Sequence, residues 1–82
     1  MATTKEDIKR WFERGVKIGA THVVIMCDTF DWEDYPVYIM PGEDARYKAE
    51  TMNGPNMQQV MEVYNLSMPM EAQLNERRSF NY

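Results

Sequence analysis

The chain has 82 residues, of which 44% are hydrophobic and 27% charged, values typical of a folded globular protein and too apolar for intrinsic disorder. A chain of this length supports one modest core, so we expect a single domain over residues 1–82. One cysteine excludes an internal disulfide, and no apolar run has the length of a signal peptide or a membrane span. We therefore expect a cytoplasmic protein without a membrane partner.

The net charge of −4 comes from the middle of the chain. Residues 1–20 carry five basic and three acidic groups, residues 28–44 carry six acidic and no basic groups, and residues 45–82 carry four of each. Because an acidic segment repels phosphate, we expect no direct binding of nucleic acid there. A basic protein surface is the kind of partner that such charge favours.

The first predicted element is an amphipathic helix. Thr3 and Glu6 have the spacing of a capping box, in which each side chain satisfies a backbone donor at the helix start. Gly19 is placed to end the helix in a left-handed conformation. Between them, apolar residues recur at helical spacing and form one stripe. The stripe consists of Ile8, Trp11, Phe12 and Val16.

Two short β-like runs follow the helix. His22–Asp28 is rich in β-branched residues, and residues 36–40 begin with a proline, which a strand tolerates at its first position. Together they predict an antiparallel hairpin whose loop is the segment between them. Both faces of the first strand are apolar, and a two-stranded sheet of this kind needs cover. We expect helices on one face of the hairpin, and helices on both faces are an alternative. Pairing of the sheet edge with a second copy of the chain, giving a homo-oligomer, is an open alternative.

The C-terminal half predicts helices alone. A turn at residues 41–44 leads into a predicted helix at 43–52, and residues 55–65 predict a third, amphipathic helix. Ser67 is the predicted N-cap of a short fourth helix at 69–77. The predicted fold is a small α+β domain in the order α-β-β-α-α(-α), with an antiparallel β-hairpin packed on helices. The third helix is predicted from the spacing of Met57, Val60, Met61 and Tyr64.

Acidic and aromatic side chains alternate in the predicted hairpin loop. Large aromatic side chains interleaved with charge are typical of protein interfaces, so we expect this loop to bind a partner protein with a basic surface. An ordinary solvated loop is the alternative interpretation. The predicted partner-binding residues are Asp28, Phe30, Asp31, Trp32, Glu33, Asp34 and Tyr35.

Catalytic chemistry has little support in the sequence. His22 and Cys27 fall on opposite faces of the predicted strand, so they form no thiol–imidazole pair. The loop carboxylates lack the glycine and the later acid of an EF-hand. A metal-dependent hydrolase built on Asp28, Asp31 and Glu33 would lack support from a histidine. We therefore predict a protein that is not an enzyme, with no catalytic residue, no metal and no cofactor.

The C-terminal tail carries a second binding hypothesis. It combines two guanidinium groups with two aromatic rings, which can grip phosphate and stack on a base. The alternative function is an oligomeric sponge that sequesters a nucleotide-like signalling ligand at a subunit interface. The residues predicted for this alternative are Arg77, Arg78, Phe80 and Tyr82.

Residues 19–38, which include the sequence CDTFDWEDYPVY, resemble small uncharacterised proteins encoded by bacteriophages, and the similarity continues through residues 41–46 and 61–64. The resemblance carries no catalytic motif. It implies an accessory protein made in the cytoplasm of the infected host cell, where such proteins occupy a host protein or sequester a signalling nucleotide. The leading prediction is therefore an inhibitor of a host anti-phage defence protein that acts through the acidic and aromatic hairpin. A structural component of the phage is the other interpretation that this resemblance leaves open.

Overall fold

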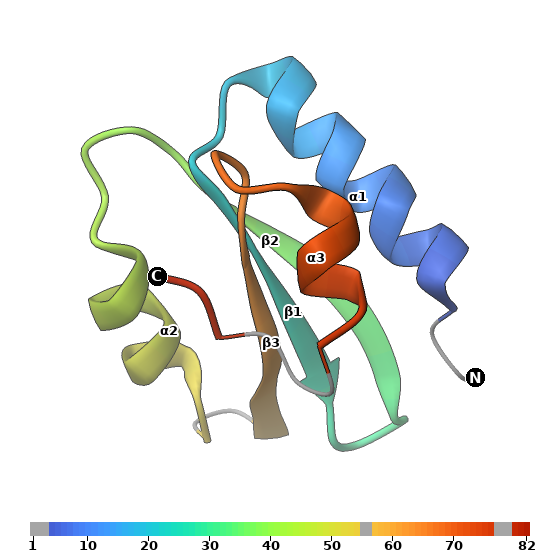
Figure 1. The fold of residues 1–82 in the computed structure, drawn as a ribbon. Helices are drawn as coiled ribbons and strands as arrows, with labels where there is room; N and C mark the ends of the chain where they lie inside the picture. The colour runs from blue at the N-terminus through green and yellow to red at the C-terminus, as the bar shows by residue number, and fades with distance from the viewer. Residues whose placement is uncertain (1–3, 55–56, 77–79) are drawn as a thin grey trace.

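The computed structural model describes residues 4–54, 57–76 and 80–82. Within these residues, three helices surround a three-stranded antiparallel sheet (Figure 1). The predicted α+β class, with a β-hairpin packed on helices, is therefore confirmed. In chain order the elements are α1 (Lys5–Ile18), β1 (His22–Asp28), β2 (Glu33–Ile39), α2 (Ala45–Met52), β3 (Gln58–Asn65) and α3 (Met70–Leu74).

The cap of α1 lies one residue beyond the predicted position. Thr4 is the N-cap, and its hydroxyl accepts a hydrogen bond from the Asp7 N–H at 3.2 Å. The Thr4 N–H donates to the Asp7 carboxylate at 3.1 Å, and this bond lowers the pKa of Asp7. The pair Thr3 and Glu6 has the same spacing as the pair Thr4 and Asp7, so the sequence pattern alone could not decide which threonine is the N-cap. Thr3 lies outside the described residues. Gly19 ends the helix with a φ of 81°, as predicted.

β1 is the central strand and pairs antiparallel with β2 on one side and β3 on the other. Its bounds agree with the predicted strand. β2 begins at Glu33, three residues before the predicted start, because Asp28 pairs with Glu33 across the hairpin. Pro36 lies inside β2, and β2 is an edge strand, where a missing N–H is tolerated. The hairpin loop is therefore limited to residues 29–32.

β3 occupies most of the segment predicted as a third helix, and that prediction was wrong. Val63 lies opposite Val24 of β1, and Tyr64 lies opposite Val23, in an antiparallel ladder. The element order is consequently α-β-β-α-β-α. Residues 55 and 56, at the start of the predicted helix, lie outside the described residues.

A β-bulge explains why β3 resembles a helix in sequence. Ile25 of β1 pairs with Glu62, but the next residue, Met26, pairs with Val60, so β3 carries one extra residue at Met61. The insertion shifts the alternation of faces within the strand. Apolar residues at 60, 61, 63 and 64 therefore face two different cores, although their spacing resembles one face of a helix.

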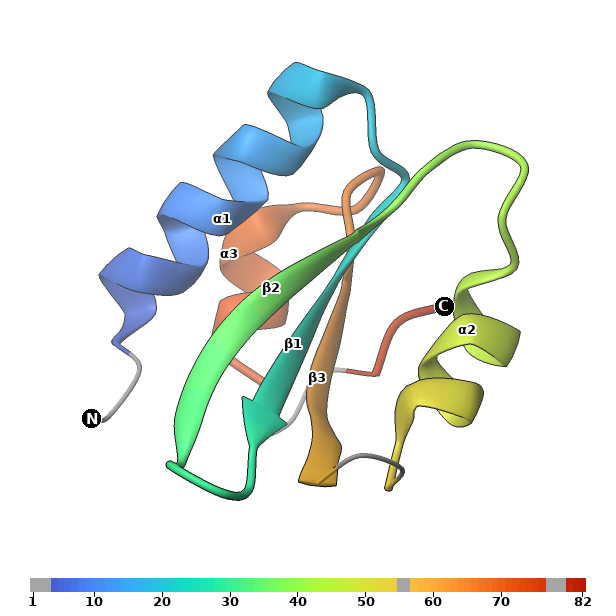
Figure 2. The same cartoon turned by 180° about the vertical axis from the view of Figure 1, so that it is seen from behind.

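Helices cover both faces of the sheet. α2 lies on one face, and α1 and α3 lie on the other, as the opposite views in Figures 1 and 2 show. Alternate residues of β1 supply both cores, with Val24 and Met26 toward α2 and with Val23 and Ile25 toward α1 and α3. The sequence favoured helices on one face, and the structure has the alternative, helices on both faces. Because one chain covers both faces, the apolar faces of β1 give no argument for a dimer, and the homo-oligomer stays an open alternative.

α3 is shorter than the predicted helix at 69–77, and its start differs. Pro69 holds the N-cap position without a side-chain hydrogen bond, whereas Ser67 donates from its N–H and hydroxyl to the Asn65 side-chain oxygen. Ser67 therefore shapes the turn after β3 instead of capping α3. Gln73 of α3 is buried and accepts the Asn65 N–H at 2.8 Å, which joins α3 to the end of β3.

Candidate functional site

The loop between β1 and β2 has a backbone conformation fixed by hydrogen bonds. The Trp32 N–H donates to the Asp28 carbonyl oxygen at 2.7 Å. The Asp28 carboxylate accepts the Phe30 N–H at 2.9 Å, and the Asp31 carboxylate accepts the Glu33 N–H at 3.3 Å. Two of the predicted acidic contact residues therefore also build the turn that presents the aromatic side chains.

The residue that precedes β3 supports the hairpin loop. The Thr29 N–H and the Thr29 hydroxyl both donate to the carbonyl oxygen of Met57, at 2.8 and 2.9 Å. Met57 directly precedes β3, so the loop is attached to the sheet at a point far away in sequence. Sequence reasoning did not identify Met57 as part of this site, because its proximity depends on the pairing of β3 with β1.

Two residues at this end of the sheet have a left-handed backbone conformation. Trp32 and Met57 each have a φ of 60°, and neither is a glycine. Non-glycine residues in this region are held there by the surrounding structure, and they are frequent at binding sites. Here the hydrogen bonds from Trp32 to Asp28 and from Thr29 to Met57 provide that restraint.

Large apolar side chains at this end of the sheet are exposed. The exposed fractions are 76% for Phe30, 64% for Trp32 and 53% for Met57. The side chains of Asp31 and Glu33 are exposed beside them in the chain. We call these five residues the hairpin tip. It combines apolar area with negative charge, on a backbone that is already ordered.

The remaining predicted contact residues are less exposed. Asp28 and Asp34 are half-buried, and Tyr35 packs against the core under α2. Asp34 lies opposite Cys27 in the sheet, and burial together with the Asp34 carboxylate raises the pKa of the Cys27 thiol. The thiol is therefore protonated near neutral pH, and Cys27 has the character of a core residue rather than a nucleophile.

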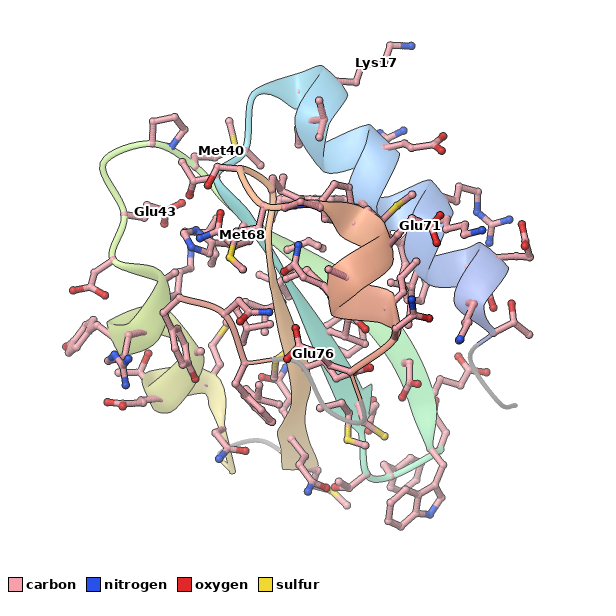
Figure 3. The ribbon with its side chains drawn as sticks, in the orientation of Figure 1. Lys17, Met40, Glu43, Met68, Glu71 and Glu76 are labelled. Carbon is pink, nitrogen blue, oxygen red and sulfur yellow. The ribbon has the colours of Figure 1, made fainter. Side chains whose placement is uncertain are left out.

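The acidic segment at 28–44 is divided between two ends of the sheet. Glu43 and Asp44 follow β2, whose seven residues separate them from the hairpin tip by about 20 Å. Figure 3 shows Glu43 at the end of the sheet away from the hairpin loop. Glu43 pairs with Lys48 and accepts the Met40 N–H, and Asp44 caps α2. These two acids stabilise the start of α2 and are not part of the tip.

The two residues considered for a thiol–imidazole pair lie far apart in the structure. His22 and Cys27 lie at opposite ends of β1, at the positions paired with Ile39 and Asp34 of β2. No group of three or more His, Cys, Asp or Glu side chains in this part of the chain is arranged to hold a metal ion. Among the same residues, no helix has both the length and the apolar character that crossing a bilayer requires.

The C-terminal residues lie against α2 and β3. Phe80 forms a parallel bridge with Val63, and Tyr82 lies under the Arg46 guanidinium, whose carbon is 4.4 Å from the ring centroid. Phe80 and Tyr82 both line a recess between these elements. Arg77 and Arg78, the cations of the predicted tail site, lie outside the described residues.

Comparison of the chain with protein-family models, with curated proteins and with solved structures finds no match. The resemblance to bacteriophage proteins therefore stays a prediction from the sequence. The candidate sites rest on the geometry of this chain alone.

Proposed function

We propose that the protein is a non-enzymatic binding protein that docks a basic protein surface through the hairpin tip. The observation that carries the proposal is the exposure of Phe30 and Trp32 on a loop whose backbone is already hydrogen-bonded. Aromatic anchors provide much of the binding energy at protein interfaces. An ordered loop loses little conformational entropy when it binds, so more of that energy contributes to affinity.

The charge of the tip supports a basic partner. Asp31 and Glu33 are exposed, and the stretch from 28 to 44 contains no lysine or arginine. Complementary charge on the partner would accelerate encounter and select against acidic surfaces, including nucleic acid. An arginine or lysine of the partner beside a pocket for Trp32 is the expected arrangement.

The partner that we propose is a host protein of an anti-phage defence system, inhibited by occupation of its basic surface. Support for this identity comes from the resemblance of residues 19–38 to bacteriophage proteins. The same resemblance supports the host cytoplasm as the place of action. The chemistry of the tip is compatible with this role, because such an inhibitor needs an ordered contact surface and no catalytic group.

Affinity capture from a bacterial host lysate tests the proposal. Immobilised wild type is compared with Trp32→Ala and with Tyr47→Ala, which removes an aromatic side chain that is 68% exposed on α2, away from the tip. We expect a protein with a basic surface to bind the wild type and Tyr47→Ala but not Trp32→Ala. If Trp32→Ala captured the same protein as well as the wild type does, the hairpin tip would not be the binding surface.

A charge-neutral variant tests the electrostatic part of the proposal. Asp31→Asn combined with Glu33→Gln removes two charges but keeps an oxygen at position 31 that can accept the Glu33 N–H. We expect slower association with the captured partner and a weaker dependence of the rate on salt. The matched control is Glu6→Gln with Glu13→Gln on α1, which removes the same charge from exposed positions outside the tip.

A further inference from the structure

α2, β3 and the C-terminal residues line an open recess of about 260 Å³ that is separate from the hairpin tip. Figure 1 shows the C-terminal segment reaching α2 after it passes β3. We call this space the tail recess. The side chains that matter for its chemistry are those of Glu50, Asn53, Gln59, Phe80 and Tyr82.

The aromatic walls of the tail recess are held in place. The Asn81 N–H donates to the Val63 carbonyl oxygen at 3.0 Å, next to the bridge between Val63 and Phe80. The Arg46 guanidinium covers the Tyr82 ring. Two aromatic side chains therefore line one small space, and aromatic side chains in such a space are suited to stack on a flat ring.

The donor and acceptor roles of the polar groups in the recess can be assigned. The Val60 N–H donates to the Asn53 side chain at 3.1 Å, which identifies the accepting atom as the amide oxygen. The amide nitrogen is consequently the group that Asn53 can offer to a ligand, as a donor. Glu50 lies in the last turn of α2 and also lines the recess, and an ionised carboxylate only accepts. Together Asn53 and Glu50 offer the recess one donor group and one acceptor group with two oxygens.

We propose that the tail recess binds the guanine base of a nucleoside or nucleotide. The Watson–Crick edge of guanine has one acceptor, O6, followed by two donors, N1–H and N2–H, and this set is complementary to an Asn53 donor together with a Glu50 carboxylate. Adenine and cytosine both present an acceptor at the position where guanine presents N1–H, and that acceptor would face the carboxylate. Phe80 and Tyr82 supply the aromatic surface for the flat ring.

The size of the recess is consistent with a single base. Pockets for drug-sized ligands begin at about 300 Å³, and the tail recess, at about 260 Å³, is slightly smaller. It suits one bicyclic ring and leaves the sugar and any phosphate outside. The proposal does not depend on the hairpin tip, since the two sites share no residue.

An NMR titration of the full chain tests this proposal. Guanosine 5′-monophosphate, guanosine, adenosine 5′-monophosphate and inorganic phosphate are added separately, up to about 10 mM, where an affinity of about 1 mM saturates the site. We expect saturable shifts with both guanine compounds at the amides of residues 49–53, 59–60 and 80–82. Equal shifts with the adenine compound or with phosphate alone, or no saturable shift, would overturn the proposal.

Substitutions distinguish base recognition from nonspecific stacking. Glu50→Gln, at an exposed position, replaces one acceptor oxygen by a donor and should reduce the preference for guanine about fivefold or more. Phe80→Leu should weaken every base about fivefold or more, at the lower end of base–aromatic stacking. Tyr47→Ala and Trp32→Ala are the controls and should leave both values unchanged. If Phe80→Leu does not fold, Glu50→Gln alone tests the proposal. An unchanged preference of Glu50→Gln for guanine would contradict it.

Discussion

Thr29 donates two hydrogen bonds to a single acceptor, the carbonyl oxygen of Met57, one from its N–H and one from its hydroxyl. The two residues are 28 positions apart in the chain, and the bonds join the hairpin loop to the residue before β3. The conformation of the hairpin tip therefore depends on all three strands. A hairpin cut out of this chain would lack that support.

Removing the Thr29 hydroxyl should loosen the tip without unfolding the sheet. Thr29→Val keeps the shape and the backbone bond but loses one hydrogen bond, which is worth about 1 kcal/mol. We expect faster hydrogen exchange at the amides of Thr29 and Trp32, and weaker partner binding. Thr51→Val is the matched control, because it removes an exposed hydroxyl bond to Lys48 on α2. Identical exchange at the tip in both variants would show that the hydroxyl does not support it.

The variant Trp32→Gly should be more stable than Trp32→Ala. Because Trp32 has a φ of 60°, any side chain there has a backbone penalty of about 1–2 kcal/mol that glycine avoids. We expect Trp32→Gly to unfold at higher urea concentration than Trp32→Ala, although both should lose partner binding. At Phe30, whose φ is not positive, the order should be reversed. Equal stability of the two variants at position 32 would contradict the left-handed conformation.

Substitution of Gln73 should destabilise the whole domain. Its side chain is 1% exposed, accepts the Asn65 N–H, and donates to the carbonyl oxygens of Asn65, Met68 and Pro69. Gln73→Leu leaves the Asn65 N–H without its acceptor, whereas the Asn65 carbonyl oxygen keeps the Met68 N–H, and an unsatisfied buried group costs about 1–3 kcal/mol. Urea unfolding should show a loss of at least this size. Gln59→Leu, at an exposed position of β3, is the control and should change stability by less than about 0.5 kcal/mol.

His22 should make stability depend on pH in the mildly acidic range. Thr21 donates its hydroxyl proton to the Ile39 carbonyl oxygen, so its oxygen accepts the His22 Nδ1–H, and the neutral ring leaves Nε2 without a partner among the described residues. Burial lowers the pKa of His22 below its ordinary value of about 6.5. The unfolded chain therefore binds more protons, and stability falls as the pH drops below about 6.5 until the pKa of the folded state is passed.

The variant His22→Gln provides the comparison for this pH effect. Its stability should vary less than that of the wild type between pH 7 and pH 5. The carboxylates of Asp7 and Glu43 have lowered pKa values, so their contributions are lost at still lower pH and affect both proteins alike. A wild-type stability that does not change over this range would contradict a neutral, half-buried His22.

The sequence correctly predicted those elements whose conformation depends on the propensities of their own residues. β1 and the end of α1 at Gly19 agree with the prediction, because β-branched residues and a left-handed glycine act on the backbone directly. β3 was mistaken for a helix, because the bulge at Met61 depends on its pairing with β1. Val16 was predicted to lie on the apolar stripe of α1, but the structure exposes it. Its neighbour Gly15 is buried against Leu66 and Tyr38 instead, so position 15 belongs to the face of α1 that packs on the domain.

The candidate site was only partly accessible to sequence reasoning. Phe30 and Trp32 were identified by their composition, and the structure places both on the exposed loop. The structural role of the Asp31 carboxylate and the proximity of Met57 follow from backbone geometry, which a charge pattern does not contain. The partner-binding role of these residues stays a prediction. The hydrogen bond between the Val60 N–H and the Asn53 side chain was not predicted, because it requires the unexpected β3.

Photo-crosslinking from the hairpin tip tests the central claim most directly. A photoreactive phenylalanine analogue is placed at Phe30 in one variant and at the similarly exposed Tyr47 in a second, and each is irradiated in host lysate. We predict one major adduct from position 30, absent from position 47 and reduced by Asp31→Asn with Glu33→Gln. The same set of adducts from both positions, or an adduct at position 30 whose yield is unaffected by charge removal and by high salt, would contradict an acidic, aromatic docking surface.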